Sequence, residues 1–134
     1  MIAFIQVILL QIFVRLRLIR KPDFMVQLVD AHPDQDSMEP GVIYVVGGRG
    51  YQKWAYFRCP AKRDEIVQLA LMPKHRPRWE VKGDWLGRPS VHPSVRQLEG
   101  SYAHFWIRQG RIDWCPDSGV RSAPFPYARQ DAWR

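Results

Sequence analysis

The sequence predicts a small all-β domain, and three observations lead to this fold class. Short runs of β-branched and aromatic residues recur along the chain and are separated by glycine, proline and other turn-forming residues. No stretch after residue 24 keeps a helical period over ten or more residues. A chain of 134 residues with 46% hydrophobic and 13% aromatic residues is typical of one globular domain.

Regular short strands favour a sandwich or a small barrel of antiparallel strands, and the fold would be α+β if the N-terminal segment were helical. Gln109-Gly110 predicts a tight hairpin turn in which the glycine supplies a positive φ. In chain order, the expected strands are MVQLVD (25–30), GVIYVVGG (41–48), QKWAYFRC (52–59), EIVQLAL (65–71), RWEVKGDW (78–85), AHFWIR (103–108) and RIDWC (111–115).

The β domain is expected over residues 25–119, between an apolar and basic extension (1–24) and a proline-containing tail (120–134). The extension reads MIAFIQVILLQIFV followed by RLRLIRK. This apolar run is shorter than the ~20 residues that span a bilayer. A secretory signal would place its positive charge before the apolar run. We therefore expect a cytoplasmic protein, with membrane-surface contact through residues 1–24 as an alternative.

The net charge of +7 does not favour a nucleic-acid binder, because most of the excess lies at the two ends of the chain. Residues 25–120 hold 13 basic and 11 acidic residues. Tyr102, Trp106 and Arg108 would suit single-stranded nucleic acid by stacking, and this is a third functional alternative. The near-neutral charge of the central region argues against it.

Ser94 is a candidate nucleophile. It follows Pro93, whose fixed φ gives a stiff turn that could present the hydroxyl group. A serine needs a base within reach, and His104 stands ten residues later at the start of an aromatic strand. Serine after proline is nevertheless common in loops, and a histidine at a strand start is more often a packing residue.

Other residues could take the supporting roles in such a site. His92 and His75 are rival bases for Ser94, and Asp84 or Asp113 could orient a histidine. Residue order along the chain does not choose among them.

The metal-ligand signal is weak. Two cysteines do not make a disulfide scaffold. Cys59, His104 and Cys115 would supply three ligands if their strands converged, whereas a structural zinc site needs four. The close pairs of ligands that mark such sites are absent from the sequence, so no cofactor is expected, with zinc held by an incomplete ligand set as the alternative.

Several motifs resemble a bacterial family known as domain of unknown function 6527. The resemblance covers roughly residues 25–119 and rests on EPGVIYVVG, KWAYFRCP, RPRWEV, DWLGRPSVHPSVRQL and HFWIRQGRIDWC. Members of that family carry Cys-Pro-Cys-Gly-Cys-Gly where this chain has the segment 59–64 (CPAKRD), and Gly-Cys where it has Gly100-Ser101. The resemblance therefore implies a zinc site of which this chain retains Cys59 alone among those cysteines.

The resemblance also implies a function. Genes of the family are often found beside genes for ubiquitin-like, E1-like and E2-like proteins, which implies removal or maturation of a ubiquitin-like protein. The implied enzyme is a serine-type peptidase or isopeptidase with Ser94 as nucleophile and His104 as base. Backbone amides near Val95 and Arg96 would stabilise the oxyanion.

The same reading assigns Tyr102, Trp106 and Trp85 to a groove for the extended tail of the ubiquitin-like substrate, which could add as an edge strand. The rival hypothesis is a non-catalytic β module with a degenerate zinc site, which binds a partner protein. The two hypotheses differ in a geometric requirement, because only the enzyme needs Ser94 and His104 to be adjacent and accessible.

Overall fold

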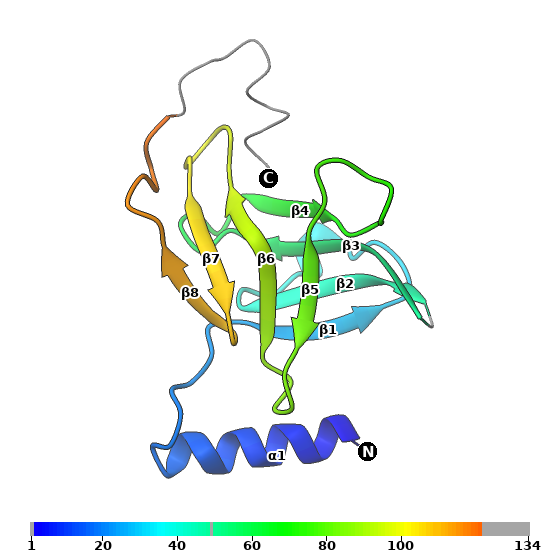
Figure 1. The fold of residues 1–134 in the computed structure, drawn as a ribbon, viewed down its shortest axis with the longest axis vertical. Coiled ribbons are helices and arrows are strands. Elements are labelled where there is room, and N and C mark those ends of the chain that lie inside the picture. The colour runs from blue at the N-terminus through cyan, green and yellow to red at the C-terminus, as the bar shows by residue number, and fades with distance from the viewer. Residues whose placement is uncertain (1, 49, 122–134) are drawn as a thin grey trace.

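The computed structural model describes residues 2–48 and 50–121, and within them the chain is mostly β (Figure 1). The C-terminal tail expected at 120–134 lies almost entirely outside the described residues. The described elements are helix α1 (Ile2–Arg15), the short 3₁₀ helix η1 (Gln35–Ser37), and strands β1 (Met25–Val29), β2 (Val42–Gly48), β3 (Tyr51–Arg58), β4 (Ile66–Ala70), β5 (Glu80–Gly83), β6 (Pro89–Arg96), β7 (His104–Arg108) and β8 (Arg111–Trp114).

Two four-stranded sheets pack face to face, with orders β1-β2-β3-β4 and β5-β6-β7-β8. Figure 1 shows the strands of one sheet crossing those of the other. This confirms the predicted β-dominated domain, and in the described part of the chain the sheets do not close into a barrel. The expectation of antiparallel strands is wrong for β1 and β2, which pair in parallel from Met25 and Val42 onward. The connection at 30–41 carries the chain back along the sheet, as parallel pairing requires.

The core lies between the two sheets, because alternate side chains of each strand face inward. The fully buried rings of Phe57 and Phe105 meet across the layers with their centroids 6.3 Å apart. Phe24 extends this aromatic contact at 5.3 Å from Phe57. A core built from apolar side chains of both sheets holds them in one fixed relation, which sets where functional groups on β6 and β7 stand.

Strand β6 was not expected from the sequence, because Pro89 and Pro93 argue against a regular strand. Its pairing with β7 is irregular. Val91 pairs with Ile107 and Val95 with Phe105, so three residues of β6 lie opposite one residue of β7 between these two pairs. The two extra residues of β6 form a bulge that removes the need for a ladder hydrogen bond from proline. Residues 92–94 therefore lie at an interruption of the sheet.

The hairpin joining β7 and β8 confirms the predicted turn. Gln109 and Gly110 both have positive φ, at 49° and 77°. A type I′ turn requires this geometry at both central positions, and its twist matches that of the flanking strands. The turn fixes the register in which Trp106 faces Asp113.

Helix α1 lies at one end of the domain (Figure 1). It touches the connection between β5 and β6, where the Phe13 and Trp85 rings stand 5.5 Å apart. In the described chain, no helix combines the length and the apolar character that crossing a membrane would need.

Candidate active site

Ser94 and His104 are brought together across neighbouring strands. Ser94 lies in the bulge of β6 and His104 begins β7, where it pairs with Arg96. The Ser94 Oγ atom lies 3.0 Å from His104 Nε2. Trp79 holds the other side of the serine, since its indole Nε1 donates to the Ser94 carbonyl at 3.2 Å. The hydroxyl and the imidazole therefore meet within hydrogen-bond distance.

Asp117 completes a three-residue chain. One of its carboxylate oxygens lies 2.6 Å from His104 Nδ1. An ionised carboxylate only accepts hydrogen bonds, so Nδ1 carries the proton in this pair. Nε2 is then unprotonated and faces the Ser94 hydroxyl as an acceptor. This is the tautomer that lets a histidine act as a base toward serine.

The turn after β8 positions Asp117. This turn is tied to the start of β7 by several hydrogen bonds. The His104 N–H donates to Ser118 Oγ at 3.0 Å, and the Gly119 N–H donates to the Tyr102 carbonyl at 2.8 Å. These contacts place the Asp117 carboxylate beside the imidazole, although the residue lies beyond the last strand.

Arg96 is a fourth member of the network. Its guanidinium donates to the second carboxylate oxygen of Asp117, and its Nη2 atom lies 3.1 Å from His104 Nδ1. Asp117 is about half exposed, at 48%, whereas the Arg96 and His104 side chains are each 20% exposed. The arginine therefore restrains a carboxylate that would otherwise be free to turn toward solvent.

The surroundings favour the neutral form of His104. Burial lowers the pKa of His104 below its ordinary value of 6.5, and the positive charge of Arg96 lowers it further. A histidine must be unprotonated to remove a proton from serine. This environment thus favours the basic form at neutral pH.

The rival bases lie in other contacts. The His92 ring is tilted against Trp106, with centroids 5.7 Å apart. His75 Nδ1 lies 2.8 Å from the Pro77 carbonyl, and its ring packs edge-on against Trp54. Neither contact involves Ser94, and both place these rings in surface packing.

Two aspartates that the sequence offered as orienting groups pair with arginines instead. Asp84 accepts from Arg88 Nε at 2.7 Å and caps the turn between β5 and β6. Asp113 pairs with Arg108 on the exposed face of the hairpin. Asp117 was missed because it stands in a Pro-Asp-Ser-Gly turn, where aspartate is an ordinary turn residue.

The three aromatic residues assigned to a substrate groove do not lie together. Trp106 shares the outer face of β7 with His104, two residues away, and Arg108 stacks on its ring at 4.5 Å. Tyr102 is half-buried in the turn before β7 and has a positive φ of 53°. Trp85 lies against α1, beyond the end of β6 that is remote from Ser94. Trp106 is thus the aromatic residue next to the histidine.

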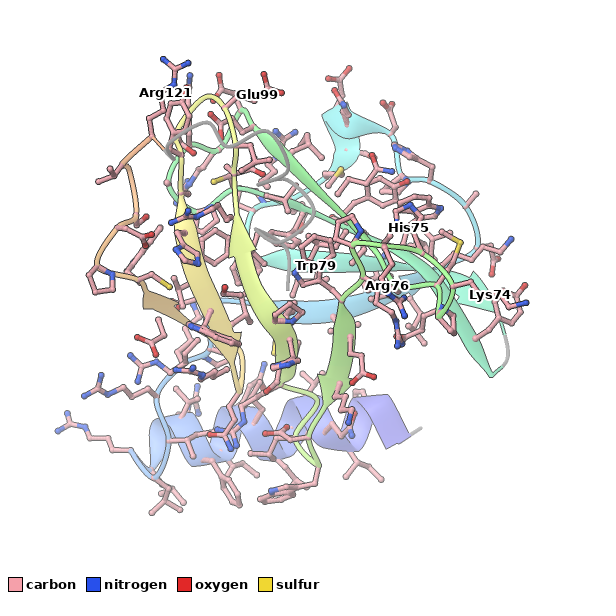
Figure 2. All side chains as sticks on the ribbon, turned by 45° about the horizontal axis from the view of Figure 1, so that its top comes forward. Lys74, His75, Arg76, Trp79, Glu99 and Arg121 are labelled. Carbon is pink, nitrogen blue, oxygen red and sulfur yellow. The ribbon has the colours of Figure 1, made fainter. Side chains whose placement is uncertain are left out.

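A cavity of about 400 Å³ borders the Ser94 strand. Val95, Arg96 and Trp79 line it on the side of the serine. Figure 2 shows His75 and Trp79 on the β4–β5 connection and Glu99 on the β6–β7 connection, and all three line this cavity. A larger cavity of about 770 Å³ is lined by residues of β1, β2, β3 and β5 together with Trp79. Neither cavity has Ser94, His104 or Asp117 among its lining residues, but only the smaller one is lined by Val95 and Arg96, the two residues that follow Ser94. The smaller cavity therefore lies next to the Ser94 segment of β6.

The residues at the zinc position implied by the family resemblance do not fit that metal. Cys59 is fully buried, and its Sγ lies 3.7 Å from Ser101 Oγ. Ala61 and Arg63, which stand where members carry cysteine, are exposed and are not zinc ligands. Glu65 instead links the neighbouring segments, because it accepts from the Ser101 N–H at 2.7 Å and from its hydroxyl at 2.8 Å.

A different group of ligand atoms surrounds the histidine. Among the described residues, His104, Cys115 and Asp117 bring theirs within 4.8 Å of one another, and Cys59 does not belong to this group. Burial, with a contribution from Asp113, raises the pKa of the Cys115 thiol, which disfavours the thiolate that binds metals. The Arg96 cation also stands among these atoms. The local charge thus favours a hydrogen-bonded triad over a metal centre.

Comparison with known proteins places this geometry in context. No curated protein matches the chain, and no solved structure does. A family model described as bacterial ubiquitination-like system serine protease (BubE) matches residues 28–115, which include Ser94 and His104. The chain therefore belongs to the BubE family of serine proteases of bacterial ubiquitination-like systems.

Proposed function

We propose that this chain is a serine peptidase or isopeptidase that releases a ubiquitin-like protein from a precursor or a conjugate. Ser94 is the nucleophile, His104 the general base and Asp117 the orienting carboxylate. The observation that carries the proposal is the unbroken hydrogen-bond chain from Ser94 Oγ through both ring nitrogens of His104 to Asp117. The family description supports the reaction class and the kind of partner.

The reaction begins when His104 Nε2 accepts the hydroxyl proton of Ser94. The serine Oγ attacks the carbonyl carbon that ends the ubiquitin-like tail, and a tetrahedral intermediate forms. His104 then gives its proton to the leaving amine as the C–N bond breaks, which leaves an ester on Ser94. Water, deprotonated by the same histidine, hydrolyses this ester and restores the hydroxyl. Asp117 stabilises the imidazolium that exists between the two proton transfers.

The oxyanion needs donors close to Ser94. The backbone amides of Val95 and Arg96 are our candidates, because they follow the nucleophile directly at the end of the bulge. Each such donor contributes on the order of 3 kcal/mol to transition-state stabilisation. The Trp79 indole, which fixes the Ser94 carbonyl, would keep this segment of backbone in place.

The substrate tail would approach along the outer face of β7 and the neighbouring cavity. Trp106 beside His104 offers an aromatic surface. The neighbouring cavity has a positively charged side chain, Arg96, and a negatively charged one, Glu99, in its lining. An extended glycine-ended tail suits this surface because it presents its carbonyl without a bulky side chain. Either an α-amine or a lysine ε-amine can leave from the same acyl carbon.

A fluorophosphonate probe tests the proposal, because it labels only serines that are activated as nucleophiles. We expect labelling of the wild-type protein and none of Ser94→Ala. Ser90→Ala is a matched control on the same strand and should keep the label. A label that persists in Ser94→Ala would refute the assignment of the nucleophile. Failure to label wild type, together with failure to cleave a ubiquitin-like precursor, would favour the non-catalytic β module.

A further inference from the structure

Helix α1 presents an apolar surface that the rest of the domain leaves exposed. Six large apolar side chains of the helix and its C-terminal turn are 40–68% exposed: Phe4, Ile5, Val7, Ile8, Ile12 and Leu16. In the helical projection these positions share one side, with spacings of three, four and seven residues. A patch of this kind on a small soluble domain marks a docking surface rather than ordinary surface variation.

The opposite side of α1 is anchored to the domain, so the orientation of the helix is defined. Leu10 is only 8% exposed, and Phe13 packs edge-on against Trp85. The Gln6 side-chain amide donates to the Trp85 carbonyl at 3.3 Å. The uncovered side therefore faces away from the sheets, at the end of the molecule where Figure 1 places α1.

A cluster of cations continues this apolar surface. Arg15, Arg17, Arg20 and Lys21 are all exposed, and the first acidic residue of the chain is Asp23. None of the four forms a salt bridge to a described residue. The N-terminal extension thus combines an apolar helix side with a basic cluster that makes no salt bridge to the part of the chain that the structure describes.

We propose that α1 and the basic segment after it dock on an anionic membrane surface. The apolar side would enter the boundary between headgroups and acyl chains, and the cations would contact lipid phosphates. The 14-residue helix is too short to cross a bilayer, so it lies along the surface. Parallel pairing of two copies through this face is disfavoured, because it would bring two clusters of four cations together.

Such docking would leave the proposed catalytic residues accessible. Trp85, against which α1 packs, lies in the connection before β6, whereas Ser94 lies near the end of the same strand. The membrane and the substrate would then approach different ends of the domain. The proposal does not depend on the catalytic assignment, and either can fail alone.

Cosedimentation of the full chain with lipid vesicles tests the docking. We expect binding to vesicles of equimolar phosphatidylcholine and phosphatidylglycerol, and weak binding to phosphatidylcholine alone. Replacing Arg15, Arg17 and Arg20 by glutamine should weaken binding by about fivefold for each cation removed. Lys62, Lys74 and Lys82 are exposed elsewhere, and their triple glutamine variant is the charge-matched control that should bind like wild type.

The apolar contribution is tested separately with Phe4→Ser/Leu16→Ser, whose parent side chains are the two most exposed of the six. This variant should lose most vesicle binding while its thermal unfolding is unchanged. Leu28→Ser removes a leucine of β1 that is more exposed than either Phe4 or Leu16, and it should leave binding intact. Equal binding of all variants, or no binding of wild type to anionic vesicles, would overturn the proposal. A dimer in solution that Phe4→Ser/Leu16→Ser abolishes would assign the face to self-association instead.

Discussion

His104 Nδ1 and Asp117 Oδ1 lie 2.6 Å apart, although the histidine starts strand β7 and the aspartate stands in the turn after β8. This contact fixes which nitrogen of the imidazole faces Ser94. It also makes the site depend on a turn that no strand pattern reveals.

Asp117→Asn should reduce kcat for cleavage of a ubiquitin-like precursor by roughly 10³- to 10⁴-fold. The amide can donate to Nδ1, which shifts the proton to Nε2 and removes the acceptor that Ser94 needs. Steady-state kinetics with the purified variant measures the loss. Asp113→Asn, which removes only the exposed pair with Arg108, is the control and should stay within about threefold of wild type. Equal effects of the two changes would exclude a special role for Asp117.

The pH dependence of kcat/KM should show an acidic limb below pH 6.5. Only neutral His104 acts as a base, and its pKa is lowered by burial and by Arg96, so activity is lost only as the pH falls through that lowered value. Arg96→Gln removes the cation and should move the limb upward toward 6.5 while also lowering kcat. Arg96→Lys keeps the charge and should keep the limb in place, although it loses the planar guanidinium that contacts both Asp117 and His104.

The matched control for this experiment is Arg108→Gln, which changes an arginine on the same strand as the histidine. Its pH profile should overlay that of wild type. A limb that does not move in Arg96→Gln would show that burial alone sets the pKa of His104.

Trp106→Ala should lower kcat/KM by roughly tenfold for the ubiquitin-like substrate, as expected for loss of one aromatic contact worth ~1.4 kcal/mol. Labelling by the small fluorophosphonate should persist, because the triad itself is untouched. Trp85→Ala removes a tryptophan that lies by α1 and should have little effect on cleavage. If the two variants behaved alike, the tail would not pass over the outer face of β7.

Glu65→Ala should lower the free energy of unfolding by about 1–3 kcal/mol, because the Ser101 N–H loses its acceptor in a partly buried site. Glu99→Ala changes an exposed acid two residues before Ser101 and should change the free energy of unfolding by less than about 0.5 kcal/mol. Chemical denaturation measures both values. Since hydrogen bonds to Glu65 make this link, a chelator should leave the wild-type Tm unchanged. A large fall of Tm with the chelator would mean that the fold depends on a metal.

The β fold was accessible from the sequence because strand formation leaves a local pattern. All seven expected strands correspond to strands of the structure, and the hairpin at Gln109-Gly110 follows from the backbone freedom of its glycine. Strand β6 was missed because its two prolines break the alternating pattern. The parallel pairing of β1 with β2 was missed because the residues of a single strand do not determine the direction of its partner. The strand that the sequence did not reveal, β6, is the one that carries Ser94.

Ser94 and His104 were proposed from the sequence as a possible nucleophile and base, but the sequence did not give the distance between them. A strand pattern gives the face on which a side chain points, whereas its neighbours across the sheet depend on register, and the register here shifts at the bulge. Asp117 and Arg96 join the site only through that register and through hydrogen bonds of the turn after β8. The sequence by itself determined the β architecture and two candidate residues. The tertiary structure decided which partners meet them, because such contacts arise only when both sheets and their turns are packed.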